Sequence, residues 1–157
     1  MIMAFAYIHP ILVPFAVALL VMGVVFEFYG KLQNEESART AGGLNIRIGL
    51  AFAVVAGVIG FMGVIGIGDI FSEADPRLNA ETKIHLRKFL TYHILFACST
   101  VLIFILALIV ARYRKNKIGE IIYFSLLGVG LVSVLAAGYC GGELVHRFGL
   151  PAPTPAQ

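Results

Sequence analysis

Four long apolar segments, separated by short polar connections, dominate the pattern of residues along the chain. Each has about 20 or more mainly apolar residues, which is the length that a helix needs to cross the hydrocarbon core of a bilayer. The pattern predicts an all-α, antiparallel four-helix membrane bundle in a single domain, residues 1–150, followed by a disordered proline-rich tail at 151–157. The predicted helices are residues 5–29, 46–70, 86–111 and 119–145.

The composition agrees with a membrane protein. The chain is 59% hydrophobic and only 13% charged, and its mean hydropathy is +0.91. A soluble domain of this length needs a more polar surface. The net charge of +3 does not indicate nucleic-acid binding, because the cations lie at the ends of the apolar segments, where positive charge sets membrane orientation. We therefore expect an integral membrane protein in contact with lipid, with no nucleic-acid partner.

The basic residues are distributed unevenly between the two sides of the predicted bundle. More of them follow the first and third segments than lie on the opposite side, and cytoplasmic connections are enriched in lysine and arginine. We therefore expect a multi-pass protein of a bacterial inner membrane, with both termini in the periplasm. The predicted cytoplasmic cations are Lys31, Arg39, Arg47, Arg112, Arg114, Lys115 and Lys117.

Two halves of the chain resemble each other. The first segment opens Tyr-Ile-His-Pro-Ile-Leu at 7–12, and the third opens Thr-Tyr-His-Ile-Leu at 91–95. Each is followed by a glycine-rich segment that ends in an acidic motif, Gly-Asp-Ile-Phe at 68–71 and Gly-Gly-Glu-Leu at 141–144. The pattern predicts two pseudo-repeated hairpins of the same orientation. His9 and His93 would then be equivalent and would face each other.

Histidines are the main candidates for chemistry. All four are expected near the same membrane surface, and histidine within a membrane segment is uncommon and usually faces the bundle interior. A single such histidine is more often a hydrogen-bonded core residue, but two in matched positions favour a binding site. The candidates are His9 and His93, with His85 and His146 as weaker ones.

Two kinds of bound group are compatible with these histidines. One is haem b, whose iron is held by axial His9 and His93 and whose propionates need cations such as Arg87, Lys88 and Arg147. The other is zinc or copper bound by three or four histidines, with Glu143 or Asp69 available. The spacing of the residues does not distinguish the two.

Glycines and one carboxylate complete the pattern. Gly57, Gly60, Gly63 and Gly66 recur every three residues in the second segment, and Gly138 with Gly142 forms a GxxxG pair in the fourth. Such glycines usually let helices pack closely, and the alternative is that they leave a slot for a flat cofactor. Glu27 is interpreted as an interfacial carboxylate within reach of Lys31 or Arg47, and residues 32–45 as a polar loop with turn glycines.

Three motifs make the chain similar to a bacterial membrane protein family of unknown function numbered 2231. They are His-Pro-Ile-Leu-Val at 9–13, His93 at the opening of the third segment, and Gly-Tyr-Cys-Gly-Gly-Glu-Leu-Val at 138–145. The resemblance implies a four-helix membrane protein, sometimes joined to or found beside Rieske or cytochrome c modules, and so a link to respiratory electron transfer. The chain departs from the family pattern at residues 14–16 and after the last motif, which leaves His9 and His93 as the better ligand candidates.

The leading functional hypothesis is a small b-type cytochrome-like electron-transfer protein or subunit, non-catalytic by itself. Its exchange partner would be a quinone or a periplasmic redox protein such as a cytochrome c or a Rieske protein. One alternative is a structural or assembly subunit of a larger respiratory complex, without its own cofactor. The other is a membrane metal-handling protein.

Overall fold

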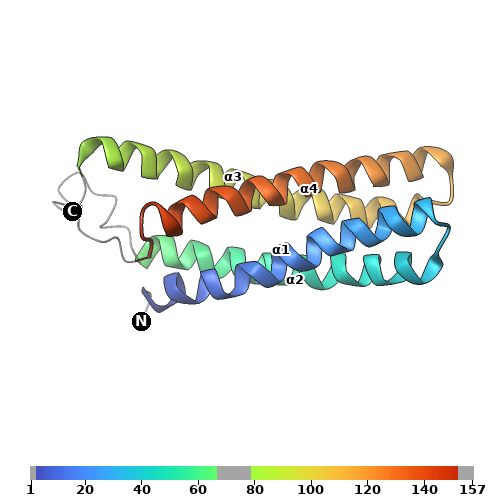
Figure 1. Ribbon diagram of the computed structural model, residues 1–157, viewed down its shortest axis with the longest axis horizontal. Coiled ribbons are helices and arrows are strands. Elements are labelled where there is room, and N and C mark those ends of the chain that lie inside the picture. The colour runs from blue at the N-terminus through green and yellow to red at the C-terminus, as the bar shows by residue number, and fades with distance from the viewer. Residues whose placement is uncertain (1–2, 67–78, 152–157) are drawn as a thin grey trace.

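The computed structural model describes residues 3–66 and 79–151, which form a bundle of four long helices (Figure 1). Each helix is long and apolar enough to cross a membrane. The predicted all-α four-helix architecture is therefore confirmed. Predictions for the connection at 67–78 and for the tail beyond Pro151 lie outside the described residues. The helices are α1 (Met3–Leu32), α2 (Glu36–Gly66), α3 (Ala80–Val110) and α4 (Lys117–His146), with a short 3-10 turn, η2 (Ala111–Tyr113), after α3.

The second helix begins ten residues earlier than predicted, at Glu36, so the expected polar loop at 32–45 is wrong. The α1–α2 connection is a tight turn in which Asn34 has a positive φ of 54°. Gly42 and Gly43, interpreted from the sequence as turn residues, lie inside α2. A Cβ atom on Gly42 would be 2.9 Å from Cγ of Glu27, so this glycine lets α2 approach α1 closely.

Asparagine caps define the starts of α3 and α4. The side chain of Asn79 accepts a hydrogen bond of 2.7 Å from the amide of Thr82, and Asn116 does the same for the amide of Gly119. Such caps satisfy amides that have no partner within the helix. The cap at Asn79 starts α3 six residues before the predicted apolar segment, and thus places His85 within the helix.

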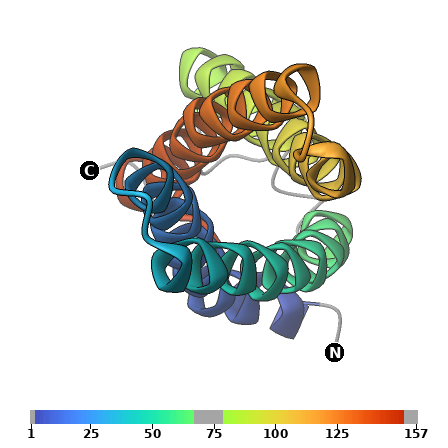
Figure 2. The same cartoon turned by 90° about the vertical axis from the view of Figure 1, so that its right-hand side faces the viewer.

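The helices form two hairpins, α1–α2 and α3–α4, and α1 and α3 begin at the same end of the bundle (Figure 1). We call this the histidine end, and the end with the α1–α2 and α3–α4 connections the connection end. Viewed along the bundle, the two hairpins lie opposite each other (Figure 2). Within each hairpin a glycine lets the helices meet: a Cβ on Gly49 would lie 3.0 Å from Cγ of Leu20, and one on Gly130 would lie 3.0 Å from Cε2 of Phe104.

The structure makes these two contacts equivalent in the two hairpins. Phe104 follows Leu20 by 84 residues, and Gly130 follows Gly49 by 81 residues. Both Leu20 and Phe104 are fully buried in a larger core that joins the hairpins, mostly in the half of the bundle nearer the connection end. A smaller apolar cluster closes the histidine end. The larger core consists of Leu20, Val24, Ile46, Phe104, Ala107, Tyr123, Leu127 and Val134, and the smaller cluster of Ala6, Leu86, Leu144, Phe148 and Leu150.

Candidate functional site

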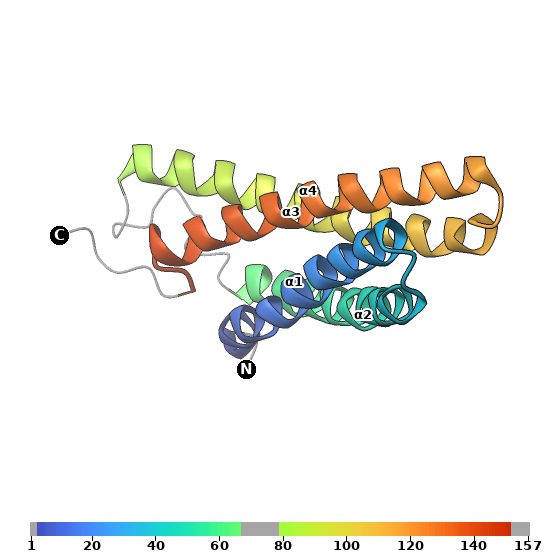
Figure 3. The same cartoon turned by 45° about the vertical axis from the view of Figure 1, so that its right-hand side comes forward.

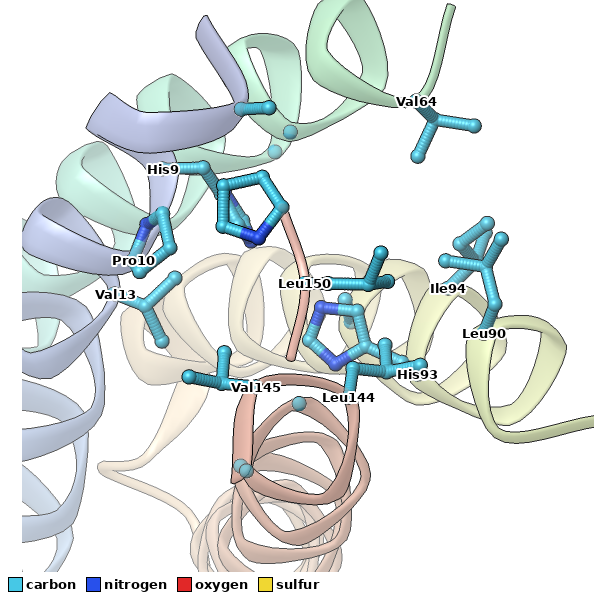
Figure 4. A pocket seen from close by; sticks show the side chains of 18 of the residues that line it. His9, Pro10, Val13, Val64, Leu90, His93, Ile94, Leu144, Val145 and Leu150 are labelled. Carbon is cyan, nitrogen blue, oxygen red and sulfur yellow. The ribbon is translucent and has the colours of Figure 1, made fainter. Parts of the chain in front are cut away.

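A cavity of about 450 Å³ lies at the histidine end and is lined by residues of all four helices (Figure 4). The oblique view in Figure 3 shows that the two hairpins cross at an angle. The start of α1 and the end of α4 both lie at the histidine end. Apolar side chains and glycines make up most of the wall. Its volume lies in the range of about 300–1,000 Å³ that is usual for small-molecule and cofactor sites.

His9 from α1 and His93 from α3 both line this cavity. Their ring centroids are 6.0 Å apart, and the ring planes make an angle of 79°. Figure 4 shows the two imidazoles next to each other, approaching from the two hairpins. The structure therefore brings together the two histidines that the repeat predicts to face each other.

The two imidazoles are held by matching hydrogen bonds. Nδ1 of His9 lies 2.8 Å from the carbonyl oxygen of Ala56, and Nδ1 of His93 lies 2.9 Å from that of Ala137. A carbonyl oxygen only accepts, so each Nδ1 carries the hydrogen and donates it. In a neutral imidazole the other nitrogen, Nε2, then has a free lone pair. Histidine ligands of metals in proteins typically have this arrangement, in which the donated N–H fixes the tautomer and the orientation of the ring.

Each ring also lies against a glycine. A Cβ atom on Gly60 would be 2.8 Å from the ring of His9, and one on Gly141 would be 2.9 Å from the ring of His93. Cβ atoms essentially never approach other atoms this closely, so any side chain here would displace the imidazole. The glycines of α2 and α4 are therefore required for the positions of the two rings.

Equivalent positions of the two hairpins line the cavity. The lining residues of α1 correspond to those of α3 at a constant offset of 84 residues, as His9 does to His93. Each lining residue of α2 corresponds to one of α4 at an offset of 81, as Gly60 does to Gly141, and α4 adds Leu144 and His146. The other matched pairs are Ala6 with Leu90, Pro10 with Ile94, Val13 with Ala97, Pro14 with Cys98, Gly57 with Gly138, Phe61 with Gly142, and Val64 with Val145.

This offset corrects one part of the sequence-based repeat. The motif at 141–144 was matched to residues 68–71, but in the structure Gly141 is equivalent to Gly60 through its contact with a histidine ring. The earlier match is therefore in the wrong register. That match rests on the acidic residue in each motif, Asp69 and Glu143, and Asp69 lies outside the described residues. Glu143 pairs with Arg147 at 3.6 Å.

The glycines serve both of the purposes considered from the sequence. Gly63 packs against α1, because its Cβ would be 2.9 Å from Cα of Ala6. Gly57, Gly138 and Gly142 instead have no atom within 4 Å of a Cβ position, and all three line the cavity. Gly138 and Gly142, predicted to form a helix-packing GxxxG pair, therefore do not pack against another helix of this chain. They leave open space beside the histidines.

The predicted cations do not line the cavity. Lys88 lies over the ring of Tyr92, with Nζ 5.9 Å from the ring centroid, and Arg147 lies over Phe148. Arg87 and Lys88 are exposed, on the turn of α3 that precedes His93. The three cations share the end of the bundle with the cavity, and their contact with a cofactor stays a prediction.

The weaker histidine candidates differ from each other. Nδ1 of His85 is 3.0 Å from the carbonyl oxygen of Glu81 in its own helix, and His85 lies outside the cavity. His146 is exposed and contributes to the cavity wall. Within residues 3–66 and 79–151, no three or more His, Cys, Asp or Glu side chains are grouped so that they could hold a metal ion. The described part of the chain brings two imidazoles together, fewer than the three or four ligands of the zinc or copper alternative.

The turn after α4 was missed by sequence reasoning. Residues 147–151 fold back, so that Leu150 and Pro151 line the cavity and Phe148 is buried. Gly149 has a positive φ of 68°, and the amide of Leu150 donates to the carbonyl of Leu144 at 3.0 Å. A glycine just beyond a helix is a usual signal for such a reversal. The proline-rich residues that follow favour the interpretation of this region as a disordered tail, so the glycine signal was not used.

The model of one protein family, described as "Predicted membrane protein (DUF2231)", matches residues 6–152. No curated protein and no solved structure matches the chain. The matched range includes both hairpins and the cavity between them.

Proposed function

The chain belongs to the DUF2231 family of predicted membrane proteins, and for it we propose the function of a small b-type cytochrome-like electron-transfer protein or subunit. His9 and His93 are the axial ligands of one haem in the cavity. The observation that carries the proposal is the opposition of these two imidazoles, each with Nδ1 bonded to a backbone carbonyl of the neighbouring helix.

The separation of the rings suits a single metal ion between them. With metal–imidazole bonds of about 2 Å on both sides, the centroids of two opposed rings lie roughly 6 Å apart. His9 and His93 have this separation, 6.0 Å. Their Nδ1 hydrogen bonds leave Nε2 of each ring as the ligand atom, so binding needs no change of tautomer.

The wall of the cavity suits a flat and largely apolar group. Gly57, Gly138 and Gly142 offer open space beside the histidines, where side chains would obstruct a planar ring. An iron ion held equally by both hairpins would lie on the pseudo-twofold axis that relates His9 to His93. A bound haem supplies one-electron redox chemistry, and the protein supplies its ligands, its orientation and an apolar surrounding.

The remaining parts of the proposal concern the surroundings of the site. Arg87, Lys88 and Arg147 are proposed to neutralise the propionates at the water boundary. With the cytoplasm assigned from the excess of basic residues at the connection end, the histidine end faces the periplasm of a bacterial inner membrane. The exchange partner is then a quinone in the membrane or a periplasmic redox protein, such as a cytochrome c or a Rieske protein.

The test is a reduced-minus-oxidised absorption spectrum of the protein expressed with sufficient haem and purified in mild detergent. We expect a b-type signal that is absent from both His9→Ala and His93→Ala. His85→Ala is the matched control, because His85 belongs to the same helix as His93 but lies outside the cavity. A haem-free wild-type protein, or a signal that survives in both variants, would overturn the proposal.

A second candidate is a metal-handling protein that binds one ion, such as copper, between the same imidazoles. It is favoured by the presence, in one cavity, of two ring nitrogens with free lone pairs. Elemental analysis separates it from the first candidate. Stoichiometric copper without iron, lost in His93→Ala, would support the second.

A further inference from the structure

We propose that the ion pair between Glu27 and Arg114 positions the two hairpins along each other, and thereby holds His9 opposite His93. The pair lies at the connection end of the bundle, far from the cavity. Its importance for cofactor binding rests on the proposed function, whereas its effect on the position of the hairpins does not.

Glu27 is the most deeply buried acidic or basic side chain among the described residues, with 1% of its surface exposed. It belongs to α1 of the first hairpin. Nη1 of Arg114 lies 3.3 Å and 3.4 Å from its two carboxylate oxygens, and Arg114 belongs to the second hairpin, between η2 and α4. The guanidinium lies over the ring of Tyr123, with Cζ 5.8 Å from the centroid. The pair thus joins the hairpins through one carboxylate that has no contact with solvent.

The carboxylate has a shaped site within its own hairpin. A Cβ on Gly42 would lie 2.9 Å from Cγ of Glu27, and a Cβ on Gly43 would lie 3.4 Å from Oε1. A side chain at Gly42 would therefore crowd Glu27, whereas a methyl group at Gly43 would only reach van der Waals contact with its carboxylate. The close contact with α2 at Gly42 fixes the position of the carboxylate within the first hairpin. The ion pair therefore forms only when the second hairpin places Arg114 beside it.

The pair breaks the repeat that the histidine end follows. At the offset of 84 residues, Glu27 corresponds to Ala111, and Arg114 corresponds to Gly30. The first hairpin therefore has the anion and the second has the cation, and the equivalent positions, Ala111 and Gly30, hold no second copy of the pair. Lys31 of α1 and Glu120 of α4 form another ion pair between the hairpins, but that pair is exposed. A contact of this kind defines one relative position of two otherwise similar hairpins.

Apolar contacts between the hairpins do not define that position as strongly. Packing of apolar side chains has little directionality, and lipid competes for the same surfaces. A slip by one helical turn, about 5.4 Å, would replace one apolar contact by another, but it would leave Glu27 buried without its cation. Glu27 and His9 lie 18 residues apart on α1, which is about 27 Å along the helix. Because the helix moves as a unit, the same slip would also move His9 out of its position opposite His93.

The test measures the position of the hairpins without any cofactor. Spin labels are attached to Ile8→Cys at the histidine end and to Ile109→Cys near the connection end, two exposed positions in different hairpins. Position 109 lies 17 residues, about 25 Å of helix, beyond the equivalent of position 8, so a slip along the bundle changes the distance between the labels directly. The background has Cys98→Ser and Cys140→Ser, and pulsed electron paramagnetic resonance gives the distance distribution. We expect one narrow distribution in this parent, and a distribution shifted or broadened by about 5 Å, one helical turn, in Glu27→Gln and in Arg114→Gln.

Two further variants separate positioning from general destabilisation. Arg114→Lys keeps the charge and should restore the narrow distribution. Lys31→Gln removes an exposed ion pair with Glu120 at the same end and should leave the distribution unchanged. Helix content by circular dichroism identifies variants that do not fold, and Arg114→Gln, whose side chain is partly exposed, then carries the test in place of Glu27→Gln.

An unchanged distribution in folded Glu27→Gln and Arg114→Gln would overturn the inference. So would equal broadening in Lys31→Gln. These distance measurements do not depend on the haem spectrum. The inference can therefore fail while the proposed function holds, and the proposed function can fail while the inference holds. If the inference and the proposed function both hold, the haem content of Glu27→Gln should be at least tenfold lower than that of the parent.

Discussion

The imidazoles of His9 and His93 lie 6.0 Å apart although 84 residues separate them in the chain. Each donates from Nδ1 to a backbone carbonyl of the other helix in its own hairpin. Neither ring depends on the other hairpin for its orientation. The site is therefore formed from two similar halves, and it is complete only when the hairpins are correctly placed.

Alanine at the glycines beneath the rings should abolish cofactor binding. In Gly60→Ala and Gly141→Ala the added methyl group would lie less than 3 Å from an imidazole, so the ring must move and its Nδ1 hydrogen bond must break. We expect at least a tenfold loss of bound haem in each variant, measured from the absorption per protein after purification.

Gly128→Ala is the matched control for these two variants. Gly128 also lies in a helix, but a Cβ there would meet no atom within 4 Å, and it is not part of the cavity wall. Haem content should stay at the wild-type level. Since alanine is favoured over glycine in a helix by about 1 kcal/mol, thermal stability should stay equal or rise slightly. Equal losses of haem in Gly128→Ala and Gly141→Ala would show that the ring contact is not the cause.

Phenylalanine at position 142 should fill the cavity without unfolding the bundle. Gly142 lines the cavity and has no atom within 4 Å of its Cβ position, so a phenylalanine side chain there has room to extend into the cavity. We expect Gly142→Phe to keep its helix content and its resistance to denaturation while its haem content falls severalfold.

The reciprocal variant distinguishes a filled cavity from a disturbed helix. Phe61→Gly removes a side chain from the same wall and should leave haem binding intact. A Gly142→Phe protein that unfolds would instead indicate that Gly142 packs against another helix, as a GxxxG pair does in many membrane proteins.

The fold was predictable because the four apolar segments have the length of a membrane helix and leave few alternatives for the backbone. The start of α2 was not. Residues 36–45 are polar and contain Gly42 and Gly43, a composition typical of loops, yet they continue the helix because the glycines face Glu27 at close range. This contact between helices cannot be seen in the local sequence.

The candidate site was predictable in part. The matched positions of His9 and His93 in two similar segments were enough to expect their opposition, whereas their hydrogen-bond acceptors were not, because the carbonyls of Ala56 and Ala137 have no side-chain signal. The pairing of Glu27 was also assigned to the wrong partner. Lys31 and Arg47 are near in sequence or in the same hairpin, but Arg114 comes from the other hairpin, and only the packing of the two hairpins selects it.

The turn after α4 should contribute measurably to stability. Phe148 is buried, and its ring centroid lies 5.9 Å from that of Phe89. Truncation of a buried phenylalanine costs about 3–5 kcal/mol in protein cores. We expect Phe148→Ala to lower the free energy of unfolding by a cost of this order, measured by denaturant titration in detergent. Phe61→Ala, which truncates an exposed ring, should change it by less than about 0.5 kcal/mol.

Removal of the cofactor should weaken the bundle through the two histidines. A ligand that binds only the folded protein stabilises it by about 2.7 kcal/mol when its free concentration is 100 times its dissociation constant. We expect the wild-type protein to unfold at a higher denaturant concentration with haem than without it. His93→Ala should show no such difference, because only one imidazole, that of His9, remains to hold the iron. If haem stabilised His93→Ala as much as the wild-type protein, the stabilisation would come from binding to some other surface, and the two-histidine site would be excluded as its cause.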